Sequence, residues 1–270
     1  MLLPRLVEAE ILEKELENPK LLIIDLCRHE YYQKHHVPGA YPLDYATIVR
    51  NAPPVGGLLP SEEQLNHVLS AIGLTPEHHV IAYDDEGGGK AARLLWTLAC
   101  IGHHNASMLN GGLFAWINEN HPVSSHLKQP TPSQYRATIA PNATALIQAE
   151  EIISALDKGE SALLDARSEG EYHGSKKFAE RAGRIPGAIH LEWTELMNQP
   201  NNMRLKPAEE IREMLKEHGI EDGQEVITYC QTHHRSALSW FVLDLLGYKA
   251  RGYEGSWSDW GNREDTPIEI

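Results

Sequence analysis

Short hydrophobic runs alternate along the chain with segments that carry apolar residues at helical spacing. In the second half, residues 161–165 and 225–229 are compact apolar runs typical of buried strands. Two segments are predicted as helices that stop at a glycine: 207–218 before Gly219, and 237–246 before Gly247. Strands and helices that alternate in this way are typical of parallel βαβ units. We therefore predict an α/β fold with mainly parallel sheets, flanked by helices on both faces.

The pattern occurs twice. LLIIDLCRHEYY, which begins at Leu21, resembles ALLDARSEGEY, which begins at Ala162, because both are apolar runs followed by Asp, Arg, Glu and Tyr. The order continues with VPGA and IPGA, and then with VIAYD and VITYC. The spacing is nearly constant, since Pro38 and Pro186 lie 148 positions apart and Val80 and Val226 lie 146 apart. The chain is therefore predicted to hold two copies of one domain.

A proline-containing stretch with little hydrophobic periodicity separates the two copies. It includes Pro130, Pro132 and Pro141 among polar residues, which is typical of a connecting linker. We predict a first domain at 1–124, a linker at 125–145 and a second domain at 146–270.

Composition limits the possible functions. The 270 residues are 41% hydrophobic, which is enough for two cores, and the formal net charge of −14 opposes binding to nucleic acid or anionic membranes. No segment approaches 18 consecutive apolar residues, and the N-terminal sequence lacks a sustained apolar core. The three cysteines, Cys27, Cys100 and Cys230, lie far apart and predict no disulfide framework. We expect a cytoplasmic monomer without nucleic-acid or membrane partners.

Cys230 is the strongest candidate for chemistry. It follows the predicted strand 225–229 and precedes a predicted helix, where open α/β sheets bind ligands. Backbone N–H groups of such a loop can converge on one point, and the helix N-terminus and Arg235 add positive charge, so a thiolate is favoured. The alternative is a small buried hydrophobic residue. It is disfavoured by the polar residues that follow, which cannot all be buried with hydrogen-bond partners: Gln231, Thr232, His233 and His234.

These features together resemble the tandem-domain rhodaneses, the thiosulfate:cyanide sulfurtransferases, over nearly the whole chain. The loop CQTHHRS resembles that of the azotobacterial rhodanese type, and the RIPGA segment that starts at Arg184 also matches. The resemblance implies two tandem rhodanese-like domains, of which only the C-terminal one is catalytic. Asp84 stands in the first copy where Cys230 stands in the second. The resemblance thus implies that the first domain is catalytically inactive.

The implied reaction moves a sulfane sulfur atom from a small anionic donor, thiosulfate, to cyanide or another thiophilic acceptor through a Cys230 persulfide, with release of sulfite. In the cell the acceptor is expected to be a thiol or a sulfur-acceptor protein. Arg235 is assigned to the anion, together with Gln231, Thr232, His233 and His234. Arg167 is a further candidate anion contact, although a buried ion pair is an equally good interpretation. The two histidines either favour an inorganic anion or cap the helix and face solvent.

Two other functions use similar residues. Cysteine-dependent phosphatases and arsenate reductases have a cysteine-headed, arginine-closed loop with five residues between Cys and Arg, whereas four separate Cys230 from Arg235. The shorter loop favours a bound sulfur atom over a tetrahedral phosphate. A non-enzymatic persulfide carrier would also need a reactive thiol, and turnover with thiosulfate would distinguish it.

The 15 histidines include four adjacent pairs, which raises the question of a metal site. Neither Cys-x-x-Cys nor His-Glu-x-x-His spacing accompanies them. We therefore predict no metal site and no cofactor other than the sulfur carried on Cys230.

Overall fold

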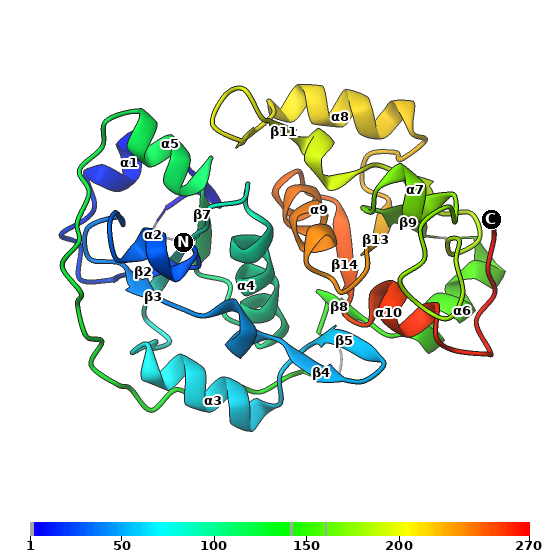
Figure 1. Cartoon of the computed structure of the whole chain (residues 1–270), viewed down its shortest axis with the longest axis horizontal. Coiled ribbons are helices and arrows are strands. Elements are labelled where there is room, and N and C mark those ends of the chain that lie inside the picture. Colours follow the sequence, from blue (N-terminus) through cyan, green and yellow to red (C-terminus); the bar gives the residue numbers. More distant parts are fainter. Residues whose placement is uncertain (1–2, 141–142, 160) are drawn as a thin grey trace. The chain divides into compact units, whose positions relative to one another are not determined.

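The computed structural model describes residues 3–140, 143–159 and 161–270, which form two compact units (Figure 1). Unit 1 contains the described residues within 1–48, 60–143 and 197–205, and unit 2 contains those within 49–59, 144–196 and 206–270. Residues 141 and 142, in the predicted linker, and residue 160 lie outside the described residues. No helix in the described part of the chain is long and apolar enough to cross a bilayer.

Unit 1 is built on a five-stranded parallel sheet with the order β1-β7-β6-β2-β3. Its strands are β1 (Leu6–Val7), β2 (Leu21–Asp25), β3 (Tyr41–Pro42), β6 (His79–Tyr83) and β7 (Ala106–Leu109). Its helices are α1 (Ala9–Glu13), α2 (His29–Tyr32), the 3-10 helix η1 (Tyr45–Ile48), α3 (Glu62–Ala71), α4 (Gly89–Cys100) and α5 (Gly112–Asn118). Residues of α1 and α5 share a core with one face of the sheet, and α4 lies on the other side (Figure 1).

Unit 2 repeats this plan with the parallel order β10-β9-β13-β14-β8. Its strands are β8 (Leu146–Ile147), β9 (Ala162–Asp165), β10 (Ile189–His190), β13 (Glu225–Tyr229) and β14 (Lys249–Tyr253). Its helices are α6 (Ala149–Lys158), α7 (Glu169–Tyr172), the 3-10 helix η2 (Trp193–Leu196), α8 (Ala208–Glu217), α9 (Arg235–Leu245) and α10 (Ser256–Trp260). The two matching sheets confirm the predicted α/β class.

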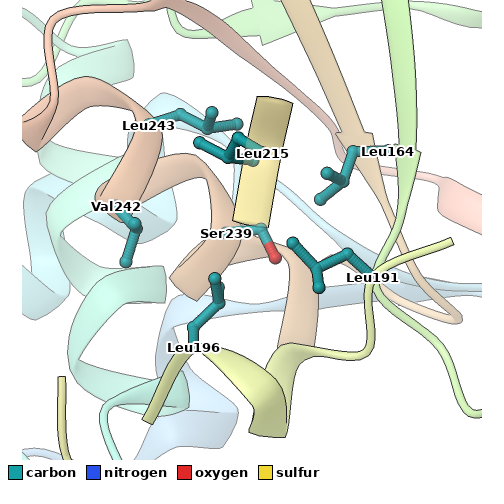
Figure 2. A pocket seen from close by; sticks show the side chains of 7 residues that line it. All are labelled: Leu164, Leu191, Leu196, Leu215, Ser239, Val242 and Leu243. Carbon is teal, nitrogen blue, oxygen red and sulfur yellow. The ribbon is translucent and has the colours of Figure 1, made fainter. Parts of the chain in front are cut away.

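The core of unit 2 lies on both faces of its sheet. Residues of α6 and α10 pack with Leu163 and Ile227 on one face, since side chains alternate along a strand. On the other face, Leu164 lines a small apolar cavity with side chains from α8 and α9 (Figure 2). Ser239 of α9 also lines this cavity, and its buried hydroxyl oxygen has no hydrogen-bond partner among the described residues.

Each unit also contains a two-stranded antiparallel hairpin that comes from the other half of the sequence. The hairpin in unit 2 consists of β4 (Arg50–Ala52) and β5 (Val55–Leu58), from the first half of the chain. The hairpin in unit 1 consists of β11 (Met197–Asn198) and β12 (Arg204–Leu205), from the second half. In unit 1, Leu205 N–H donates to Asn110 at 2.8 Å, and Arg204 is ion-paired with Glu119. The compact units are therefore discontinuous along the chain, while the boundaries 1–124 and 146–270 stay a prediction.

The predicted linker has no helix or strand among its described residues. Part of it runs along α3 of unit 1. Tyr135 N–H donates to Ser70 Oγ at 2.9 Å, and Ala137 N–H donates to Asn66 Oδ1 at 2.6 Å. These hydrogen bonds hold this extended segment in place without secondary structure of its own.

Candidate active site

Cys230 lies at the carboxyl end of β13, the middle strand of the unit 2 sheet, directly before the loop that leads into α9. β13 covers the residues predicted as a strand, and α9 begins at Arg235, two residues before the predicted start. The loop from Cys230 to Arg235, called here the cysteine loop, therefore lies where parallel α/β sheets bind ligands.

Ser256 anchors the cysteine loop, although no motif in the sequence singles it out. Its hydroxyl accepts the N–H groups of Cys230 at 3.2 Å and His233 at 3.0 Å, and donates to Tyr253 O at 2.8 Å. The next two residues complete the connection: Trp257 N–H donates to Cys230 O, and Ser258 N–H donates to Gln231 O, both at 2.9 Å. The loop is thus fixed to the turn between β14 and α10.

The Cys230 side chain is completely buried, but polar groups surround it. Burial alone would raise its pKa. The charge of Arg235, the Ser236 hydroxyl and the backbone N–H groups of Ser236 and Thr232 outweigh this effect, so the pKa of Cys230 lies below its ordinary value. Cys27 shows the opposite case, because burial and the charge of Asp25 raise its pKa.

Arg235 has a partner that the sequence analysis missed. Its two terminal nitrogens each donate to one carboxylate oxygen of Glu171, both at 2.8 Å. Burial raises the pKa of Glu171, but the hydrogen bonds from Arg235 and Ser168 outweigh burial and lower this pKa to about 2. Glu171 is therefore ionised at neutral pH, and the two side chains form a bidentate ion pair beside the cysteine loop.

The other predicted loop residues have different environments. Thr232 supplies its N–H toward the Cys230 sulfur, and the Gln231 side-chain amide donates to Phe178 O at 3.0 Å. His233 is buried, with Nδ1 2.8 Å from Ser236 Oγ, so it does not face solvent. His234 stands at the N-cap of α9 but makes no side-chain capping hydrogen bond, and its ring lies 6.0 Å from that of Trp193.

Arg167 makes a buried ion pair with Asp165, and its role as an anion contact stays a prediction. Its guanidinium donates to both carboxylate oxygens of Asp165 and to Gly183 O, at 2.6–3.0 Å, and it is 1% exposed. It also lies over the ring of Trp257. Because its N–H groups serve a buried ion pair, Arg167 holds β9 and neighbouring segments together, which was the second interpretation of the sequence.

The hairpin β4–β5 packs against the cysteine loop within unit 2. Gly56 N–H donates to Ser258 Oγ at 3.0 Å, and Leu59 N–H donates to Glu254 at 2.5 Å. Gly57 has a φ of +74°, and a Cβ on it would lie 2.1 Å from Thr232 O. Only glycine allows this approach, so the hairpin and the loop touch through their backbones.

The corresponding loop in unit 1 contains the carboxyl group of Asp84. The Asp84 carboxylate accepts the N–H groups of Glu86, Gly88 and Ala91 at 2.9–3.0 Å, and Asp84 is 1% exposed. This loop leads into α4, as the cysteine loop leads into α9. The acidic residue thus satisfies the N–H groups that could otherwise bind an external anion.

One cluster in the described residues brings three possible metal ligands together: Glu10, Glu119 and His121 of unit 1, with ligand atoms within 4.8 Å of one another. His121 Nδ1 lies 2.6 Å from Glu13, and Glu119 is ion-paired with Arg204. Glu119 and His121 thus already have polar partners within unit 1.

Comparisons with known proteins agree with this architecture. The Rhodanese-like domain matches residues 8–119 and 148–263. Thiosulfate sulfurtransferases from Azotobacter vinelandii and Pseudomonas aeruginosa are 39% and 40% identical, over 99% of this chain and 98% of each relative. The solved structure of an anaerobic ergothioneine biosynthesis enzyme from Chlorobium limicola has a TM-score of 0.86 at 24% identity, over 98% of this chain and 70% of that one, and shows likeness of fold. With both halves matched and relatives aligned almost end to end, this chain belongs to the rhodanese-like family.

Proposed function

We propose that this chain transfers the outer sulfur atom of thiosulfate through a persulfide on Cys230. The chain is a sulfurtransferase, as are the two relatives that align along nearly its full length. The observation that carries the assignment to Cys230 is its place at the carboxyl end of β13, in a loop where Arg235, Ser236 and backbone N–H groups favour its thiolate. A thiolate held in this way is a ready nucleophile.

The proposed reaction has two steps. The Cys230 thiolate attacks the outer sulfur of thiosulfate, the sulfur–sulfur bond breaks, and sulfite leaves with the electron pair, so that a persulfide anion remains. An acceptor then attacks the terminal sulfur and restores the thiolate; cyanide leaves as thiocyanate, and a protein thiolate leaves as a persulfide. The N–H groups of Thr232 and Ser236, which favour the thiolate, also suit the charge of the persulfide.

The proposal assigns the chemistry to unit 2 alone. In unit 1 the corresponding residue is Asp84, whose carboxyl group accepts the loop N–H groups that an anionic donor would need. Unit 1 is therefore proposed to be catalytically inactive.

Replacing the nucleophile tests this function. We expect Cys230→Ser to lower thiosulfate-dependent thiocyanate formation by at least about 10³-fold, because the hydroxyl neither ionises nor carries sulfur at neutral pH. Cys27→Ser is the matched control and should keep wild-type turnover, since the pKa of Cys27 is raised by burial and Asp25. Wild-type turnover in Cys230→Ser would contradict the proposal.

A further inference from the structure

Among the described residues, Glu171 is the one acidic side chain that hydrogen-bonds Arg235 of the cysteine loop. Both of its oxygens accept from Arg235 at 2.8 Å, so the two planar groups face each other in a bidentate arrangement. The Glu171 side chain is 6% exposed and that of Arg235 is 21% exposed, which keeps most of the pair out of water. An interaction with this geometry and burial is stronger than an ordinary surface ion pair.

Glu171 is itself fixed by its own short helix. It is the N3 residue of a capping box at the start of α7, in which its carboxylate accepts the Ser168 backbone N–H at 3.3 Å. The same carboxylate also accepts the Ser168 hydroxyl at 2.7 Å. The capping box and the ion pair together leave the carboxylate little freedom to move. Arg235 is therefore held in a fixed place, from which its charge acts on the Cys230 sulfur.

The ion pair between Glu171 and Arg235 also sets the net charge next to Cys230, where an anionic donor would bind. Arg235 and Glu171 sum to zero, so a thiolate on Cys230 leaves this group of three residues with a net charge of −1. Thiosulfate is a dianion at neutral pH, and sulfite is then a mixture of its monoanion and dianion. Without the carboxylate, the same group would be neutral with the thiolate present, and Arg235 would have two terminal nitrogens to offer to an anion.

We propose that Glu171 is a positioning residue that also sets the charge of the sulfur-transfer site: it holds Arg235 beside Cys230 and limits how tightly the site binds thiosulfate and sulfite. This inference rests on the proposed function of Cys230. Its physical basis is that the donor and the leaving group are both anions. An acidic partner lowers the affinity of the site for both, so sulfite can leave after each transfer.

Glu171→Gln removes the charge and keeps the shape. One amide oxygen still accepts from Arg235, but the guanidinium is no longer neutralised. We expect the thiolate of Cys230 to form at a pH lower by about one unit, because a nearby cation then acts on it without compensation. Thiosulfate KM should fall several-fold, and sulfite should inhibit at several-fold lower concentration, with no increase in kcat.

The measurements separate charge from folding. The ultraviolet absorbance of the thiolate is titrated against pH with the Cys230→Ser variant subtracted, and steady-state rates are measured with and without added sulfite. Glu151→Gln is the matched control, since Glu151 is also the N3 residue of a capping box and pairs with an arginine, Arg251, at 2.6 Å. It should leave all three quantities at wild-type values.

Glu171→Asp covers the case in which the glutamine variant does not fold, because its carboxylate is drawn back by one methylene. It should shift the three quantities in the same direction but less. Unchanged Cys230 titration and sulfite inhibition in the folded variants, or shifts in the opposite direction, would overturn the inference. Failure of the proposed function is a different result, because wild-type protein would then gain no sulfur from thiosulfate.

Discussion

Cys230 has no exposed surface, and a cysteine buried among apolar side chains would have a raised pKa. The environment of this cysteine is polar instead, with Arg235 and the hydroxyl of Ser236 among its closest influences. Burial then strengthens the effect of each of these groups, because less water screens them. At the scale of the residue, reactivity comes from which groups are buried together.

The pH dependence of sulfur transfer follows from this balance. Arg235 lowers the pKa of Cys230, so removing its charge should raise that pKa and reduce the thiolate fraction at a given pH. We expect Arg235→Gln to move the acidic limb of the kcat/KM profile upward by roughly one pH unit or more. Arg251→Gln, which loses a contact to Glu151 instead, should keep the wild-type profile. An acidic limb that stays in place would show that Arg235 does not act on the thiol.

Ser239 gives a prediction about stability that is independent of catalysis. Its hydroxyl is buried at an apolar cavity (Figure 2), and no residue in the described part of the chain hydrogen-bonds it. A buried hydroxyl without a partner keeps its desolvation penalty, so Ser239→Ala should raise the free energy of unfolding by about 1 kcal/mol. Urea denaturation followed by circular dichroism measures the change. A loss of stability would show that the hydroxyl is in fact satisfied.

At the scale of the element, the sequence predicted strands and helix ends well. Residues 225–229 form β13 as predicted, and Gly219 follows α8 with a φ of +79°, as a helix-ending glycine should. The predicted start of α9 was two residues late, because Arg235 and Ser236 turn into the helix while still facing the cysteine loop. Hydrophobic periodicity does not reveal polar residues that belong to a helix and also act on a neighbouring loop.

The missed residues show why the rest was out of reach. Ser168 and Glu171 form a capping box whose Ser-x-x-Glu spacing is visible in the sequence, but the partner of Glu171 lies 64 residues away. Ser256 acts on the cysteine loop only because of the turn between β14 and α10. Such contacts depend on tertiary structure, which local patterns do not encode.

Gly57 offers a test of how the hairpin β4–β5 supports the loop. In Gly57→Ala the new methyl group would collide with Thr232 O, in addition to the backbone strain of about 1–2 kcal/mol at positive φ. We expect sulfur transfer to fall by roughly tenfold or more, since small displacements of reacting groups are costly.

Gly187→Ala is the matched control for this variant. Gly187 lies in the same unit with a φ of +73°, and no atom of the residues that the structure describes lies within 4 Å of its added Cβ. It should share the loss of stability but keep the activity. Equal activity in the two alanine variants would show that the hairpin does not support the cysteine loop.

At the scale of the whole molecule, the duplication could be predicted because matched blocks recur at nearly constant spacing. The two sheets have corresponding strand orders, and the family domain matches both halves. The hairpins could not be assigned in this way. Residues 49–59 pack within unit 2 and residues 197–205 within unit 1, and no boundary drawn once along the sequence describes that arrangement.

The central claim, that one thiol of the three in the chain carries sulfur, has a direct test. Wild-type protein is incubated with thiosulfate without an acceptor, and its intact mass and peptide masses are then measured without reductant. We predict one added sulfur atom per chain, on the peptide that contains Cys230, and none in Cys230→Ser. Sulfur on a peptide containing Cys27 or Cys100 instead, or no added sulfur in the wild-type protein, would contradict the account.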